Sequence, residues 1–182
     1  LDQVSLQVSH GERVAIIGAG GIGFDMAAFL GHDSMDMAAF EDFWGISRDK
    51  EQRGGLVKPE DEHSKRELFM LKRSPGKPGK GLGKTTGWIH RQTVKKMGVE
   101  ALSSVEYVRI DDAGLHIEQK GEPRVLEVDH VVICAGQESD RSLESDLKSL
   151  GVEPHIIGGA LNAGGIYPKR AIEEGYRLGL AL

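Results

Sequence analysis

The feature that most constrains the fold is a short apolar run that leads directly into a glycine-rich turn. The run VAII at residues 14–17 is mostly β-branched, which is typical of a buried strand in a parallel sheet. Gly18, Gly20 and Gly23 follow at the G-x-G-x-x-G spacing. We therefore predict a strand, a tight turn and then a helix that ends at Gly31.

Each residue of this turn has a physical role if the turn binds a dinucleotide. Gly18 lets the chain turn sharply out of the strand, Gly20 lets the backbone approach a pyrophosphate, and Gly23 lets the helix pack on the sheet. The free amides of the first helical turn, which includes Gly21 and Ile22, would then face the phosphates. We predict a dinucleotide-binding turn, with a merely structural glycine turn as the alternative.

Composition excludes several other classes of function. A net charge of -5 gives no reason to expect nucleic acid as a partner, and no apolar stretch is long enough to predict a membrane span. Cys134 is the single cysteine, so the chain has no disulfide of its own and no cysteine set for zinc or an iron–sulfur cluster. We predict a core role for Cys134, no metal site, no catalytic residue and a cytoplasmic location.

The remaining patterns predict an α/β protein. Strands alternate with helices, as in a doubly wound parallel sheet, and residues 107–127 form short alternating runs that are typical of an antiparallel β-meander crossover. We predict a Rossmann-like, three-layer nucleotide-binding fold. The expected strands are 68–71, 99–102, 131–134 and 155–157, and the expected helices start near Thr85 or Thr86, at Ser142, and at Lys169 after Pro168.

Residues 31–66 separate the first helix from the next strand and are interpreted as an insertion. Ser34 is predicted to cap a short helix that ends at Gly45, and residues 47–65 are predicted to form a polar surface loop. Phe43 and Trp44 on this helix need a covering surface, which favours a contact with another domain over a solvated excursion.

A second nucleotide signal lies where the strand 68–71 ends. Enzymes that bind NAD usually place a carboxylate there, whereas this chain has Lys72 and Arg73, followed by Lys77 and Lys80. A cation suits the 2′-phosphate of NADPH, and arginine can bind a phosphate through two hydrogen bonds. We therefore predict NADPH rather than NADH, although solvated loop charges would give the same pattern.

Gly83-Lys84-Thr85 opens a predicted helix and so raises the alternative of a P-loop. That motif needs a glycine where this chain has Pro78, which makes a nucleotide triphosphate site the weaker interpretation. Lys84 is instead a candidate for binding a phosphate of the dinucleotide.

Several segments together resemble one enzyme family. In chain order they are 14–25, the KPGKGLGKTTGWIHR segment at 77–91, 131–138, 157–159 and 170–172. They resemble the NADPH-binding region of bacterial NADPH-dependent 2,4-dienoyl-CoA reductases. The segment 77–91 is the specific match, because glycine fingerprints are shared by many flavoproteins.

The resemblance implies a piece of a longer flavoenzyme. Members of this family carry an FMN-bearing barrel, an iron–sulfur cluster and an FAD domain into which the NADPH domain is inserted. Residues 1–154 would be that NADPH domain, and 155–182 the last strand and helix of the FAD domain. The partners would be the FAD and barrel domains of the parent chain. The resemblance adds cofactor-binding candidates at Ala135, Gly136, Gly158 and Gly159.

One departure from the family concerns the binding of FAD, and two functional hypotheses stay open. The family has acidic residues where this chain has Leu161 and Tyr167, so the carboxylate contacts to FAD are missing. The first hypothesis is the hydride-delivering domain of a flavin-dependent reductase of unsaturated fatty acyl-CoA. The alternative is a non-catalytic nucleotide-sensing module with the same fold.

Overall fold

The computed structural model describes residues 7–32, 36–49, 51–59, 64–165 and 167–182. The chain divides into two compact units, Leu1–Ala135 and Gly136–Leu182, which we describe separately. The family resemblance implies a boundary at 154/155, which is taken from the domains of that family and not from compactness. This boundary stays a prediction.

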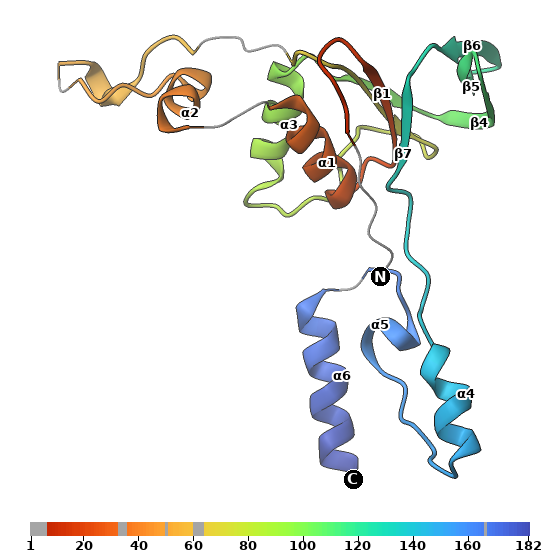
Figure 1. Cartoon of the computed structure of the whole chain (residues 1–182). Coiled ribbons are helices and arrows are strands. Elements are labelled where there is room, and N and C mark those ends of the chain that lie inside the picture. The colour runs from red at the N-terminus through yellow and green to blue at the C-terminus, as the bar shows by residue number, and fades with distance from the viewer. Residues whose placement is uncertain (1–6, 33–35, 50, 60–63, 166) are drawn as a thin grey trace. The chain divides into compact units, whose positions relative to one another are not determined.

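The first unit is built on a parallel sheet of four strands (Figure 1). Its order is β3-β2-β1-β7, so the strand that leads into the glycine turn lies inside the sheet and is paired on both sides. The strands are β1 (Arg13–Ile17), β2 (Glu67–Lys72), β3 (Glu100–Ser103) and β7 (His130–Ile133).

Both faces of this sheet are covered. Successive side chains of β1 point to opposite faces, so Val14 and Ile16 pack beneath α1 (Gly21–Gly31) and α3 (Gly87–Lys96). Ala15 and Ile17 pack against an antiparallel sheet of three strands. Those strands are β4 (Val105–Asp111), β5 (Gly114–Gln119) and β6 (Glu122–Leu126). The predicted α/β class, parallel sheet, meander and three layers are confirmed.

The insertion carries more structure than the sequence predicted. Helix α2 (Met37–Trp44) is capped by Asp36, whose carboxylate accepts a hydrogen bond from the Ala39 amide at 2.8 Å. The predicted cap, Ser34, lies outside the described residues. The predicted loop also contains a short 3-10 turn, η1 (Arg53–Gly55), and an antiparallel bridge between Ile46 and Leu56.

Helix α2 of the insertion contacts helix α3. The ammonium group of Lys96 donates to the carbonyl of Phe43 and lies 4.6 Å from the centre of its ring. Phe43 is 3% exposed, and Trp44 meets Trp88 edge-on with their ring centres 6.5 Å apart. Residues of this chain therefore pack against both Phe43 and Trp44.

The second unit consists of helices α4 (Ser142–Ser149), α5 (Gly158–Leu161) and α6 (Pro168–Ala181). Pro168 occupies the first turn of α6, as predicted. The predicted strand at 155–157 is wrong, because those residues form no strand in the structure. An extended segment becomes a strand only beside a hydrogen-bonding neighbour, and the described residues contain none beside this one.

Candidate dinucleotide-binding site

The glycine turn begins where three parallel strands end. The Gly18 amide donates to the Leu71 carbonyl at 2.9 Å, and the Cys134 amide donates to the Ile17 carbonyl at 2.7 Å. These bonds extend the pairing of β1 with both neighbours into the turn. The turn therefore lies at the carboxyl edge of the sheet, where α/β proteins of this topology bind ligands.

Two of the glycines are required by close packing. Gly18 has a φ of 123°, and a side chain there would place its Cβ 2.4 Å from the Cys134 carbonyl oxygen. A Cβ on Gly23 would lie 1.9 Å from the carbonyl oxygen of Gly18. Neither position can accept a larger residue without moving backbone, so the turn and the start of α1 are held in close contact.

The other two glycines leave space for a ligand. A Cβ on Gly20 or Gly21 would meet no atom within 4 Å. Helix α1 has no side-chain cap and no acidic residue in its first turn, and its first backbone bond runs from the Phe24 amide to the Gly20 carbonyl. The amides of Gly21, Ile22 and Gly23 precede that bond, at the positive end of the helix dipole. Open space and amides without a partner among the described residues together fit a pyrophosphate.

The loop between β2 and α3 lies against this turn. The Gly79 amide donates to the Ala19 carbonyl at 3.2 Å, and the Arg91 guanidinium donates to the Gly79 carbonyl at 3.1 Å. Gly79 has a φ of 70°, and a Cβ there would lie 2.8 Å from the Phe24 ring. The amides of Gly79 and Leu82, within the candidate motif, bond to backbone carbonyls, which counts against the P-loop alternative.

Arg73 follows β2 and lines a cavity of about 420 Å³. Burial raises the pKa of the Tyr107 phenol in this cavity, and the Arg73 charge opposes that rise. Sequence reasoning missed the rest of the lining, which is Pro75, Ser104, Glu106 and Tyr107. Part of this lining could have been predicted from the sequence, because residues that directly follow β3 must reach the same edge of the sheet as residues that follow β2.

The predicted phosphate-binding cations are not brought together. Lys77 lines a different cleft from the one that Arg73 lines, and Lys84 is exposed in the loop before α3 and lines neither. Arg73 is thus the cation that the structure places in a cavity at the carboxyl edge of β2. The roles of Lys77 and Lys84 in binding the cofactor stay predictions.

Strand β7 contributes backbone to the turn. The Cys134 carbonyl faces Gly18, and the Ala135 nitrogen would lie 3.2 Å from a Cβ at that position. Burial raises the pKa of the Cys134 thiol, which keeps the thiol neutral and agrees with its predicted core role. Gly136 belongs to the second unit, together with Gly158 and Gly159.

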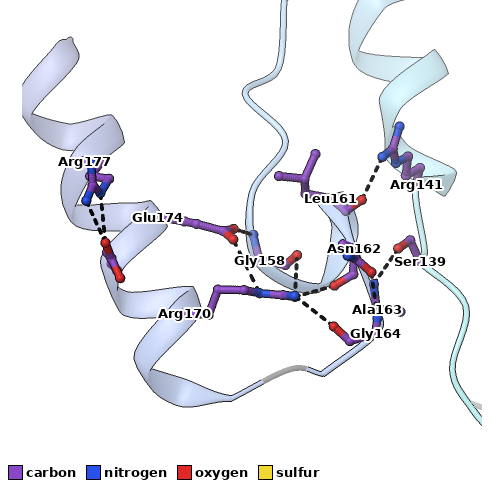
Figure 2. Close-up of polar contacts among 11 residues, drawn as sticks. Ser139, Arg141, Gly158, Leu161, Asn162, Ala163, Gly164, Arg170, Glu174 and Arg177 are labelled. Carbon is purple, nitrogen blue, oxygen red and sulfur yellow. Dashed lines mark hydrogen bonds and ion pairs between the residues drawn. The ribbon is translucent and has the colours of Figure 1, made fainter.

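The second unit holds its own polar network around the predicted FAD turn (Figure 2). The Gly158 amide donates to the Glu174 carboxylate, so it already has an anionic partner. The Arg170 guanidinium points at the carbonyls of Asn162 and Gly164, and Arg141 donates to the Leu161 carbonyl at 3.0 Å (Figure 2). Binding of FAD at Gly158 and Gly159 stays a prediction, and at Gly158 it requires the ligand to displace Glu174.

Among the described residues, no helix is both long and apolar enough to cross a membrane.

Comparison with known proteins places this geometry in context. A family model described as pyridine nucleotide-disulphide oxidoreductase matches residues 2–160. A solved structure of 2-naphthoyl-CoA reductase in complex with 2-naphthoyl-CoA is similar, with 21% identity, a TM-score of 0.63, and coverage of 96% of this chain and 22% of that one.

Two further solved structures share the fold. For 6-hydroxypseudooxynicotine amine oxidase from Pseudomonas geniculata N1, the identity is 15% and the TM-score 0.64, with 94% of this chain and 22% of that chain covered. For histamine dehydrogenase from Rhizobium sp. 4-9, the identity is 14% and the TM-score 0.59, with 92% and 22% covered. This chain therefore spans about a fifth of the length of each of these proteins.

Proposed function

The chain belongs to the pyridine nucleotide-disulphide oxidoreductase family, and from this membership we propose that it binds NADPH and delivers its hydride to FAD. The parent protein we propose is a flavin-dependent reductase of the 2,4-dienoyl-CoA reductase type, which reduces unsaturated fatty acyl-CoA. The observation that best supports this proposal is that helix α1 begins without a side-chain cap, beside open space at the carboxyl edge of the sheet.

The proposal assigns separate tasks to the residues of the first unit. The amides of Gly21 and Ile22 hold the pyrophosphate, and Gly20 keeps the space before them clear. Arg73 binds the 2′-phosphate through charge-assisted hydrogen bonds, in the cavity that it shares with Tyr107. When bound, the dinucleotide supplies the hydride, and the protein positions it.

The remaining chemistry belongs to the rest of the parent protein. The chain's single cysteine can neither hold an iron–sulfur cluster nor form a disulfide within the chain. We therefore assign FAD, FMN and the cluster to the FAD and barrel domains, with this chain as their NADPH-binding partner in the cytoplasm. The similar naphthoyl-CoA reductase structure also holds a CoA thioester, which is in line with a thioester substrate for the parent.

Titration calorimetry with NADPH and NADH tests the proposal. We expect NADPH to bind more tightly and Arg73→Ala to remove the preference, because losing a hydrogen bond to a charged group costs about 1.5–3 kcal/mol. That cost is roughly a 10- to 100-fold loss of NADPH affinity. Arg53→Ala, in the turn η1 of the insertion, is the matched control, because Arg53 does not line this cavity. Equal affinities for the two cofactors, or an Arg73→Ala variant that keeps its preference, would contradict the proposal.

A further inference from the structure

A second cleft in the first unit shares no lining residue with the Arg73 cavity. It has a volume of about 380 Å³, near the lower end of the range for small-molecule sites. The apolar part of its lining comes from α1, β2, α3 and the segment that forms β3. Phe24, Met70 and Val94 are almost fully buried and form its floor, whereas Val99, just before β3, and Ala101 are more exposed. A cleft of this size and polarity can accommodate a ring system or a short acyl group.

Three cations line the same cleft. They are Lys77 in the loop after β2, and Arg91 and Lys95 on α3. None of the described lining residues is acidic. The dipole of α3 accounts for a cation at Lys95, in the last turn of the helix, but not for Lys77 or Arg91.

A hydrogen bond from Arg91 connects the two elements that carry these cations. The guanidinium donates to the Gly79 carbonyl at 3.1 Å, and this bond ties α3 to the loop that carries Lys77. Gly79 is itself fixed to the glycine turn through the Ala19 carbonyl and against the Phe24 ring. The loop and the helix therefore present their cations at the cleft from two directions.

We propose that this cleft is a second ligand site, separate from the dinucleotide site, and that it binds a phosphate ester of an apolar or aromatic group. The apolar lining receives the body of the ligand, and Lys77, Arg91 and Lys95 receive the phosphate. Lys77 then serves this site instead of its predicted role in binding the cofactor. A dianionic phosphate matches three cations, in a cleft whose described lining has no acidic residue, better than a single carboxylate does.

The probe for this site is 1-naphthyl phosphate, titrated into the whole chain and followed by its own fluorescence and by calorimetry. Inorganic phosphate and 1-naphthol are the two partial ligands, which supply only the charge and only the apolar body. We expect one site for the probe and at least tenfold weaker binding of either partial ligand. Saturating NADPH should not displace the probe.

Variants separate a built site from general attraction to a basic surface. We expect Lys77→Gln and Lys95→Gln each to weaken probe binding about tenfold, the usual order for one charge-assisted contact. Ala101→Leu should weaken it as well, by narrowing the cleft without removing a charge. Lys80→Gln is the matched control, because Lys80 lies on the same loop but does not line the cleft.

Several outcomes would overturn the proposal. Unchanged binding in Lys95→Gln and Ala101→Leu would remove the cleft from the site. Equal losses in Lys80→Gln and Lys77→Gln would mean that the probe senses only surface charge. Displacement by NADPH, together with weaker probe binding in Arg73→Ala, would place the probe in the dinucleotide site. Circular dichroism of each variant verifies that the fold is kept.

Discussion

Gly18 and Gly20 are two residues apart, yet a methyl group would meet very different surroundings at each position. At Gly18 it would collide with the Cys134 carbonyl oxygen at 2.4 Å, on a backbone with a φ of 123°. At Gly20 it would meet nothing within 4 Å, and the φ of -92° is ordinary for alanine. The first glycine is therefore required by the fold, whereas the second is free to serve a ligand.

This contrast predicts two different losses. Gly20→Ala should fold like the parent chain but bind NADPH at least about tenfold more weakly, a cost of about 1.4 kcal/mol, because the methyl group occupies the space of the pyrophosphate. Gly18→Ala should lower the free energy of unfolding by several kcal/mol, as expected for a backbone clash on a strained φ. Urea unfolding and a cofactor titration on both variants check this. Full affinity in Gly20→Ala would remove the turn from the binding site.

Residues far apart in sequence explain why the site was predicted only in part. The glycine turn could be found because its spacing lies within six residues of one segment. The separation of Arg73 from Lys77 depends on the path of the loop after β2, which no local pattern encodes. The hydrogen bond between Gly158 and Glu174 joins residues that are sixteen positions apart, so no local pattern predicts it either.

At the scale of single elements, the short helix α2 depends on its first and last contacts. Asp36 satisfies the Ala39 amide at the start, and the buried Phe43 ties the end of the helix to Lys96 of α3. Since helices of this length are marginal in isolation, we expect both contacts to be needed.

Replacing the cap gives a direct test. Asp36→Ala should lower the free energy of unfolding by about 1 kcal/mol, whereas Asp36→Asn should keep most of it, because asparagine also accepts the amide hydrogen bond. Urea unfolding of the two variants side by side measures the difference. Identical urea midpoints for Asp36→Ala and Asp36→Asn would mean that α2 unfolds independently of the sheet.

The elements also show what local sequence patterns can predict. β1 and β2 were found because each is an apolar run that is buried in the sheet. β7 was found because it is also an apolar run, although it is only partly buried at the edge of the sheet, and α1 because a glycine turn precedes it. The expected strand at 155–157 has the same apolar character but no strand beside it. Asp36 and Ser34 are both good caps, and only the position of the first helical residue, Met37, selects Asp36.

At the scale of the whole molecule, the chain holds the proposed dinucleotide site in one unit and, in the other, a glycine turn whose Gly158 amide is bonded to Glu174. We expect no NADPH oxidation when the chain alone is supplied with a dienoyl-CoA thioester. Hydride transfer needs an acceptor such as FAD, the sequence carries no second glycine fingerprint, and the Gly158 amide is bonded to Glu174.

An NADPH-oxidation assay at high protein concentration, with and without added FAD, measures this. The thioester product is followed by mass spectrometry, and a sample without thioester corrects for background oxidation. Thioester-dependent oxidation in the absence of added flavin would show that the chain carries a complete reductase.

Because β1 lies between two strands, the exchange of its backbone hydrogens can detect the binding of any of these ligands. Val14, Ala15 and Ile16 are 0% exposed, with strands on both sides and covered faces above and below. Their backbone hydrogens can exchange with deuterium in the solvent only when the whole first unit opens. A ligand that binds only the folded state slows such opening by mass action, about a hundredfold when its concentration is a hundred times its Kd. The hydrogen-exchange rate of these three amides therefore reports ligand binding. Any compound that binds this unit, in either cleft, will lower that rate.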